Sequence, residues 1–269
     1  MQDKISKYLA VLDAAQFPYP SYSDEELTKA YSKLCTELVA NTSNTGLELV
    51  KQYHPSIWRC NINGRPTPLD AWHDKAIMSK VIANRLKYLK VENLSLNNLL
   101  TGLSVTKLAP KVSIFRPAMA KYLVQKYLNE YDTIFDPCAG FSGRMLGTCC
   151  LDKKYIGQDI NATTLNESKQ LKNFLLLNAE LAIKDSIYDT GDYDCLFTCP
   201  PYGNKENWHQ SIEELSADEW ITTCLQNYKC KRYLFVIDKT DQYSQYIVER
   251  LSNKSHFSNA TELVILIDR

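Results

Sequence analysis

A glycine-containing turn and a later aspartate have the types and spacing of residues that hold a nucleoside. The apolar run Thr133–Phe135 leads into Asp136 and then into glycines at positions 140 and 143, just before a helical pattern. Glycine lets the backbone come close to a ligand where a side chain would block it. Asp159 follows Asp136 by 23 residues and ends the next apolar run. A carboxylate there accepts hydrogen bonds from ribose hydroxyls, so the pair favours a ligand that contains a ribose.

Asp185 and Ser186 follow a third apolar run, Leu181–Ile183. An aspartate at this place can accept a hydrogen bond from the exocyclic amine of an adenine. It can equally be the capping residue of an ordinary turn. The residues alone leave both interpretations open.

A rigid proline loop ends a fourth apolar run. The sequence Cys199-Pro200-Pro201-Tyr202 comes directly after Cys195–Phe197. Proline fixes φ and has no N–H group, so such a loop presents carbonyl acceptors. A carbonyl beside an aromatic face suits a flat base that bears an amino group. We therefore expect Tyr202 to stack on a base while the carbonyl of Pro200 accepts from its amine.

The elements that must position these residues alternate along the second half of the chain. Strands are expected at Thr133–Phe135, Tyr155–Gly157, Leu181–Ile183, Cys195–Phe197, Tyr233–Ile237 and Leu263–Ile267, and helices at Leu165–Leu177, Ser216–Leu225 and Tyr243–Leu251. This alternation predicts an α/β fold with a parallel, doubly wound sheet and helices on both faces. Ligands of such sheets bind at the carboxyl ends of the strands, which is where the motifs fall.

The N-terminal region predicts helices and loops instead. Ser23 and Glu26 form a capping box that opens one helix, and a second helix is expected over Thr67–Leu89. We therefore expect two domains: a mainly helical region at 1–110 and the sheet domain at 111–269.

Taken in order, these motifs resemble those of a known enzyme family. Asp136-Pro137-x-Ala139-Gly140, Asp159, Asp185 and Cys199-Pro200-Pro201-Tyr202 are similar to the motifs of the S-adenosylmethionine-dependent DNA amino-methyltransferases, the N6-adenine and N4-cytosine enzymes. The likeness covers residues 111–269. Ser113–Lys121 is similar to that family's helix-opening motif, which closes over the methionine end of the cofactor. The resemblance implies a Rossmann-like class I methyltransferase sheet with S-adenosylmethionine as cofactor.

The resemblance also implies roles for the matching residues. The turn from Asp136 to Gly143 would cradle the methionine part, Asp159 would bind the ribose, and Asp185 the adenine edge. Arg116 is either a partner of the cofactor carboxylate or a surface arginine. The full set of expected cofactor contacts is Phe115, Arg116, Asp136, Cys138, Ala139, Gly140, Phe141, Gly143, Asp159, Ile160, Asp185 and Ser186. The residues expected to hold the target base are Cys199, Pro200, Pro201 and Tyr202.

The chain departs from the family in three places. Its glycine turn reads Gly-Phe-Ser-Gly where Gly-Ser-Gly is more common, so Phe141 is extra or displaced. The proline loop opens with Cys199, a weak acceptor, where the family has Asp, Asn or Ser. Serine is its nearest isostere, and a Thr-Ser-Pro-Pro-Tyr loop is common in the N4-cytosine branch of that family. The resemblance therefore favours cytosine N4 slightly over adenine N6. A covalent role for Cys199, as in C5-cytosine methylation, is disfavoured because the cysteine precedes the prolines. The usual target-recognition domain is missing.

Positive charge gathers in one part of the chain. Lys+Arg and Asp+Glu are both 31, yet residues 51–126 hold 13 basic and 3 acidic residues, with aromatic residues interleaved. This pattern suits contact with a phosphate backbone, and solvated helix faces or a dimer face are the alternatives. Region 1–110 is therefore the candidate for DNA recognition or dimerisation, with Arg59, Arg65 and Lys75 as the candidate nucleic-acid contacts.

Several classes of protein are disfavoured by composition. The nine cysteines have no CxxC spacing, and the four histidines have no ligand spacing to a cysteine pair, so we expect reduced thiols and no metal. No apolar run approaches the ~18 residues of a membrane helix, and the N-terminus lacks a signal-peptide pattern. A cytoplasmic protein with no membrane partner is expected.

The sequence therefore favours a DNA methyltransferase that transfers a methyl group to the exocyclic amine of a flipped-out base in double-stranded DNA. Protection against a cognate restriction endonuclease and assembly as a homodimer fit this hypothesis. One alternative keeps the enzyme but changes the substrate to RNA or to a protein amide. Another is a non-catalytic nucleic-acid-binding subunit with the same fold, for which Cys199 is the best support.

Overall fold

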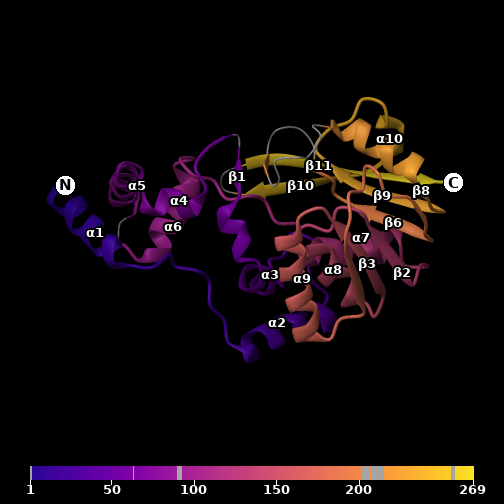
Figure 1. Cartoon of the computed structure of the whole chain (residues 1–269), viewed down its shortest axis with the longest axis horizontal. Coiled ribbons are helices and arrows are strands. Elements are labelled where there is room, and N and C mark those ends of the chain that lie inside the picture. The colour runs from indigo at the N-terminus through magenta and orange to yellow at the C-terminus, as the bar shows by residue number, and fades with distance from the viewer. Residues whose placement is uncertain (1, 63, 90–92, 202–205, 208–214, 256–257) are drawn as a thin grey trace. The chain divides into compact units, whose positions relative to one another are not determined.

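The computed structural model describes residues 2–62, 64–89, 93–201, 206–207, 215–255 and 258–269 (Figure 1). Its helices are α1 (Gln2–Ala14), α2 (Asp24–Thr36), α3 (Leu47–Tyr53), α4 (Pro68–His73), α5 (Lys75–Tyr88), α6 (Leu96–Val105), α7 (Pro117–Tyr127), α8 (Gly143–Cys149), α9 (Ala162–Leu175) and α10 (Ala217–Asn227), with 3-10 turns η1 (Pro55–Arg59) and η3 (Ser244–Tyr246). Its strands are β1 (Asn61–Ile62), β2 (Thr133–Asp136), β3 (Lys154–Asp159), β4 (Ala179–Ile183), β5 (Gly191–Asp192), β6 (Cys195–Thr198), β7 (Glu206–Asn207), β8 (Tyr228–Lys229), β9 (Arg232–Ile237), β10 (Ile247–Ser255) and β11 (Ser258–Asp268).

The chain divides into two compact units, and no single cut in the sequence separates them. The helical unit comprises residues 1–20, 55–113 and 204–210, and the sheet unit comprises 21–54, 114–203 and 211–269. The capping box at Ser23 and Glu26 is present, but the helix that it opens, α2, belongs to the sheet unit. None of the described helices is long and apolar enough to cross a membrane.

The helical unit packs around aromatic side chains. The Phe17 ring lies against the rings of Trp58 and Trp72, with centroids 5.4 and 5.6 Å away, and all three are buried. The helix expected over Thr67–Leu89 is interrupted. The Asp74 side chain accepts hydrogen bonds from two backbone N–H groups of the following turn, so α4 ends and α5 begins at this residue.

The sheet unit contains a seven-stranded sheet in the order β10-β11-β9-β6-β2-β3-β4. The strands from β9 through β6, β2 and β3 to β4 pair in parallel, whereas β11 runs antiparallel to both β9 and β10. The chain moves outward from β2 to β4 and then returns to the other side of β2. The expected α/β class with a Rossmann-like sheet is confirmed, and its switch point lies between β2 and β6.

Alternate side chains of the central strands are buried on opposite faces of this sheet. In β9, Leu234 and Val236 join a cluster with α7, whereas Tyr233 and Phe235 join a cluster with Trp220 of α10. This double burial explains the continuous apolar runs of the sequence. It also places helices on both faces, as the sequence predicted.

The helix expected over Tyr243–Leu251 is wrong. The segment forms only the short η3 turn, and β10 then pairs with β11 as an antiparallel hairpin. Val248 and Arg250 are exposed, whereas Ile247 and Leu251 are partly or fully buried, so burial alternates as in a strand. Pairing with β11 decided the structure where the local sequence was ambiguous.

Within the sheet unit, a lysine of α7 binds the C-terminal end of α2. The buried Lys121 ammonium donates to the carbonyls of Leu34, Cys35 and Glu37 at 2.6, 3.2 and 3.0 Å. These carbonyls lie at the end of α2, where backbone acceptors lack helical partners. One side chain of α7 thereby holds the C-terminus of α2 in place.

Two glycines allow α7 and α8 to approach closely. A Cβ atom on Gly147 would lie 2.5 Å from both Ala120 Cβ and the Pro117 carbonyl oxygen. A Cβ atom on Gly143 would overlap the carbonyl oxygen of Phe115. The segment 113–121 therefore sits directly against the glycine turn because position 143 has no side chain.

Replacement of Gly143 by alanine tests this contact. We expect Gly143→Ala to lower the free energy of unfolding by about 3 kcal/mol or more, because backbone atoms must move apart. Gly140→Ala is the matched control, since Gly140 has φ of +54° but its nearest neighbour is 3.9 Å from a Cβ atom. It should cost only about 1 kcal/mol of backbone strain. Equal losses in chemical denaturation of the full chain would contradict this account.

Candidate cofactor site

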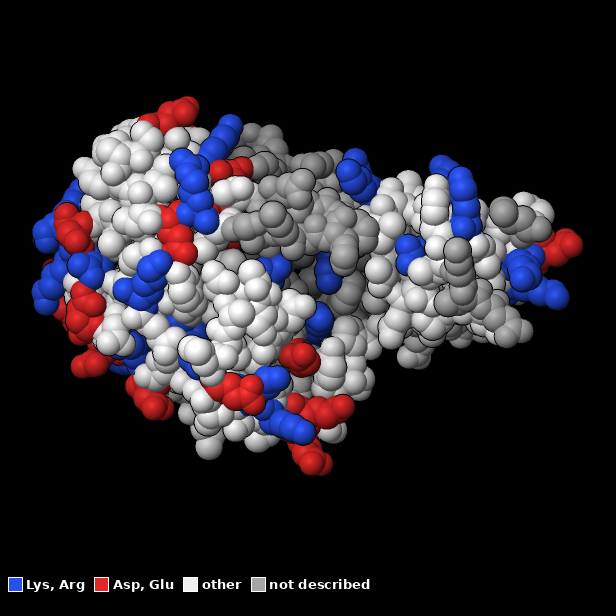
Figure 2. Space-filling model, turned by 180° about the vertical axis from the view of Figure 1, so that it is seen from behind, with Lys and Arg blue, Asp and Glu red and all other residues white. Residues whose placement is uncertain are grey.

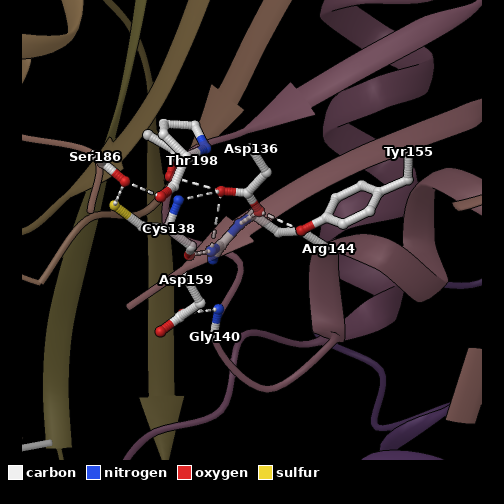
Figure 3. Close-up of polar contacts among 9 residues, drawn as sticks. Asp136, Cys138, Gly140, Arg144, Tyr155, Asp159, Ser186 and Thr198 are labelled. Carbon is white, nitrogen blue, oxygen red and sulfur yellow. Dashed lines mark hydrogen bonds and ion pairs between the residues drawn. The ribbon is translucent and has the colours of Figure 1, made fainter. Parts of the chain in front are cut away.

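The sequence motifs meet at the carboxyl ends of four neighbouring strands (Figure 3). β2 ends at Asp136, β3 ends at Asp159, β4 leads into Asp185, and β6 ends at Thr198 just before the proline loop. Hydrogen bonds between these strand ends, described below, join them into one cluster at the switch point of the sheet.

The Asp136 carboxylate lies at the centre of the cluster and is fully buried. One oxygen accepts from Tyr155 Oη at 2.7 Å and from Arg144 Nε at 2.6 Å. The other accepts from Thr198 Oγ1 at 2.8 Å and from the Cys138 backbone N–H at 3.1 Å. A contact between Asp136 and the cofactor stays a prediction, and in the structure the carboxylate has protein donors on both of its oxygens. It organises the turn from within.

Arg144 carries the charge that balances Asp136. Arg144 is only 4% exposed, and its guanidinium also donates to the Cys138 carbonyl. Burial by itself would lower the pKa of Arg144, but the charge of Asp136 raises it, so the residue stays cationic. Its guanidinium carbon lies over the Phe115 ring, 5.1 Å from the centroid. Phe115 thus packs on the ion pair, while Arg116, also half-buried, forms the N-cap of α7.

The glycine turn is anchored to β3 at two points. The Ala139 N–H donates to the Gln158 carbonyl at 2.7 Å, and the Gly140 N–H donates to an Asp159 oxygen at 2.8 Å. The second Asp159 oxygen accepts from the Asn161 N–H at 2.8 Å, beyond the half-buried Ile160. Burial raises the pKa of Asp159, although its two backbone donors oppose that shift. Asp159 therefore supports the turn as well as ending the strand.

The two middle residues of Gly-Phe-Ser-Gly are buried. Phe141 is 6% exposed and meets the His54 ring edge-on, with centroids 5.5 Å apart. Ser142 is 1% exposed and bonds to His54 and Ser168. The extra residue in Gly-Phe-Ser-Gly is thus accommodated by packing against α3, which the sequence did not reveal.

The end of β4 is tied to the same turn. The buried Ser186 hydroxyl donates to the Pro137 carbonyl and lies 4.0 Å from Cys138 Sγ. Asp185 is half-buried, and its carboxylate accepts from the Ile187 N–H at 3.0 Å. This last contact is that of a capping aspartate in a turn, one of the two interpretations left open by the sequence.

The proline loop starts next to Asp136. Thr198, whose hydroxyl donates to Asp136, immediately precedes Cys199, which is half-buried against the cluster around α7. Pro200 and Pro201 continue the loop. Tyr202 lies outside the described residues. The start of the proline loop and the glycine turn therefore share one carboxylate.

The three candidate nucleic-acid contacts are exposed in the helical unit. Arg65 donates to the Lys107 carbonyl, and the Lys75 ammonium pairs with the Asp13 carboxylate at 2.7 Å. Arg59 ends the η1 turn. Arg65 and Lys75 would have to exchange these partners for phosphates, a modest cost for exposed groups.

A cavity of about 410 Å³ opens on the sheet near this site. Residues of β3 and β4 line it, together with Lys184 and Tyr193. None of the expected cofactor residues does. Among the described residues, no group of three or more His, Cys, Asp or Glu side chains is placed to hold a metal ion.

Sequence reasoning missed the donors to Asp136 and the histidine behind the turn. Arg144 follows Asp136 by eight residues at the start of the helix, and this strand-acid, helix-arginine spacing is a signal that could have found it. Tyr155 and Thr198 are separated from Asp136 by 19 and 62 residues, and His54 from Ser142 by 88. The order of the strands brings Tyr155 and Thr198 to Asp136, and the packing of α3 brings His54 to Ser142.

Comparison with known proteins gives similarities in fold alone. No family model matches the chain, and no curated protein does. A proposed RNA methyltransferase from Pyrococcus horikoshii is 10% identical, with a TM-score of 0.44 over 57% of this chain and 82% of that one. The tRNA (uracil-54, C5)-methyltransferase of Pyrococcus abyssi, in complex with S-adenosyl-L-homocysteine, is 17% identical, with a TM-score of 0.43 over 59% and 41%. An rRNA methylase from Streptococcus thermophilus is 15% identical, with a TM-score of 0.39 over 58% and 99%.

Replacement of Asp136 tests its central role. Asp136→Asn keeps the shape but leaves Arg144 as a buried charge without its counter-ion, so we expect a loss of about 3–5 kcal/mol in the free energy of unfolding. Tyr155→Phe is the matched control, because it removes one hydrogen bond to the same carboxylate and should cost about 1 kcal/mol. Chemical denaturation of both variants measures the difference. A loss for Asp136→Asn no larger than that for Tyr155→Phe would refute the assignment.

Proposed function

We propose that this chain is an S-adenosylmethionine-dependent methyltransferase that acts on the exocyclic amine of a base in DNA. The observation that carries the proposal is the shared position of the glycine turn and the proline loop. Both begin at the switch point of the sheet, and the carboxylate of Asp136 joins them through Thr198 and the Cys138 N–H. A cofactor in one and a base in the other would be neighbours.

The residues of the turn suit the cofactor. Gly140 has a left-handed φ of +54°, and no heavy atom lies within 3.9 Å of the place where a Cβ atom would stand. A ligand can therefore approach its backbone closely. Asp159 has two oxygens with about four acceptor sites, so its two backbone donors leave capacity for ribose hydroxyls. When bound, S-adenosylmethionine would supply an activated methyl group.

The proline loop would orient the acceptor amine. Pro200 and Pro201 have no backbone N–H, so the loop presents carbonyls that can accept from the amine. Alignment at about 3–3.5 Å from the methyl carbon is what in-line transfer requires. Such acceptors also favour loss of the amine proton. The base must leave the duplex to reach the loop, at a cost of a few kcal/mol.

A nucleic acid is the favoured substrate because the helical unit is basic, and the resemblance to the DNA amino-methyltransferases favours DNA over RNA. Residues 1–20 and 55–113 carry 11 basic and 5 acidic side chains. Figure 2 shows Lys and Arg side chains at the surface of both units, with the two signs of charge mixed over the sheet unit. Phosphate contacts from the helical unit would be independent of sequence. Serine-like Cys199 favours cytosine N4 over adenine N6.

Transfer of a labelled methyl group from S-adenosylmethionine tests the proposal directly. Unmodified duplex DNA, total RNA and a glutamine-containing protein extract are incubated in parallel, and digests are analysed by mass spectrometry. We expect N4-methylcytosine in DNA, and N6-methyladenine would keep the enzyme class while changing the base. A label found only in RNA or only in protein would show that this polymer, and not DNA, is the substrate. Absence of both transfer and cofactor binding would refute the function.

The Asp159 carboxylate gives a pH-dependent prediction for cofactor affinity. Only the ionised form accepts from both ribose hydroxyls, and burial raises the pKa of Asp159. S-adenosylhomocysteine should therefore bind most tightly at about pH 7.5 and more weakly as the pH falls towards the raised pKa of Asp159. Asp159→Asn should weaken binding by about tenfold or more at the higher pH and flatten the pH dependence. Calorimetric titration measures both effects, and an unchanged profile in Asp159→Asn would assign the pH dependence to another group.

A further inference from the structure

A buried chain of hydrogen bonds lies behind the glycine turn. The fully buried His54, the C-cap of α3, contacts Ser142 Oγ through Nε2 at 2.8 Å and a Glu167 oxygen through Nδ1 at 3.2 Å. Ser142 Oγ donates to Ser168 Oγ at 2.8 Å, and Ser168 donates to the Thr164 carbonyl at 3.0 Å. The chain links α3 and α9 to the residue that precedes α8.

Ser142 needs such support because its backbone is strained. It has φ of +60°, in the left-handed region that a serine rarely adopts, at the point where the turn after β2 becomes α8. Residues in this region persist when their surroundings over-determine them. Ser142 has no side-chain capping bond to its own helix. Its hydroxyl instead contacts His54 and Ser168, which come from two other helices.

Counting hydrogens fixes the role of the histidine. The Ser142 hydroxyl has one hydrogen, which it gives to Ser168, and Ser168 gives its own to Thr164. Ser142 Oγ must then accept from Nε2–H of His54. The contact between His54 Nδ1 and the Glu167 oxygen then needs one further proton, which either the imidazole or the carboxyl group carries. Burial lowers the pKa of His54, and Glu167 opposes that shift.

A serine, histidine and carboxylate in this order also resemble a nucleophile triad on a strand–turn–helix elbow. Burial argues against that role here. Ser142 is 1% exposed and His54 is 0% exposed, so no acyl substrate can reach the hydroxyl. The hydroxyl hydrogen is committed to Ser168, whereas a nucleophile gives it to the histidine. The geometry is that of a structural hydrogen-bond network that supports the glycine turn.

We propose that His54 is a positioning residue for the cofactor turn: by donating to Ser142, it holds residues 140–143 in the conformation that binds S-adenosylmethionine. The proposal rests on the proposed function for the identity of the cofactor. It adds that His54, which lies 88 positions before Ser142 in the sequence, controls the affinity of the turn for the cofactor. The turn would then lose cofactor affinity when the Ser142 contact is lost, even though its own residues are unchanged.

Two substitutions at His54 separate the contacts. In His54→Gln the amide can reach the place of Nε2 and donate to Ser142. In His54→Asn the shorter amide can reach the place of Nδ1 and meets only Glu167. We expect His54→Asn to weaken S-adenosylhomocysteine binding by about three- to tenfold, the worth of one hydrogen bond, and His54→Gln to stay within about twofold of the natural chain. KM for the cofactor should rise in His54→Asn with kcat little changed. Equal affinities in the two variants would overturn the proposal.

Amide hydrogen exchange tests the same idea without the cofactor. The Gly140 N–H donates to Asp159 and the Leu146 N–H donates to the Ser142 carbonyl, so both report on the turn. Their exchange should be faster by about three- to tenfold in His54→Asn but not in His54→Gln. Unchanged exchange in His54→Asn would refute the positioning role even if the chain binds S-adenosylmethionine. Failure of the natural chain to bind, with the exchange difference present, would instead refute the proposed function alone.

Ser142 provides a second pair of variants in case His54 cannot be replaced. Ser142→Ala removes the hydroxyl and keeps the strain, whereas Ser142→Gly removes both. We expect faster Gly140 exchange in Ser142→Ala and partial recovery in Ser142→Gly. The opposite order would show that the hydroxyl does not hold the turn. Labelling of Ser142 in the natural chain by a fluorophosphonate would overturn the proposal in favour of a nucleophile.

Discussion

The buried carboxylate of Asp136 is the constraint on which the site depends. A charge without water must find donors nearby, and Asp136 finds them on β3, β6, the turn and α8. Each donor fixes a different element relative to the end of β2. The ion pair with Arg144 adds little net stability by itself, because burying two charges is costly. Its effect is to allow only one arrangement of the strand ends.

Close packing imposes the second constraint. The segment that carries Phe115 and Arg116 reaches the turn only because Gly143 and Gly147 let α7 lie against α8. Phe115 then covers the guanidinium of Arg144 and excludes water from the ion pair. The charge cluster and the glycines therefore depend on each other: the packing keeps the pair dry, and the pair keeps the turn in place.

Local patterns in the sequence predicted the parts of the fold that local physics controls. The apolar runs of β2, β3, β6, β9 and β11 were found because strands buried on both faces are apolar throughout, and the edge strand β4 was found from the short run Leu181–Ile183. The segment Tyr243–Leu251 was misread because a hairpin partner, absent from any local window, makes β10 a strand. Asp74 was missed as a helix boundary because an aspartate inside a helical pattern gives a weak signal.

The site shows the same division between local and distant information. The motifs placed Asp136, Asp159, Ser186 and the proline loop at one edge, since the carboxyl ends of parallel strands must meet there. They could not show that Asp136 faces inward, because that depends on Arg144, Tyr155 and Thr198 together. In the sequence, Phe141 was interpreted as an extra or displaced residue of the turn. In the fold, Phe141 and Ser142 are where a buried histidine outside the expected catalytic domain makes contact, and no local pattern in the sequence indicates that contact.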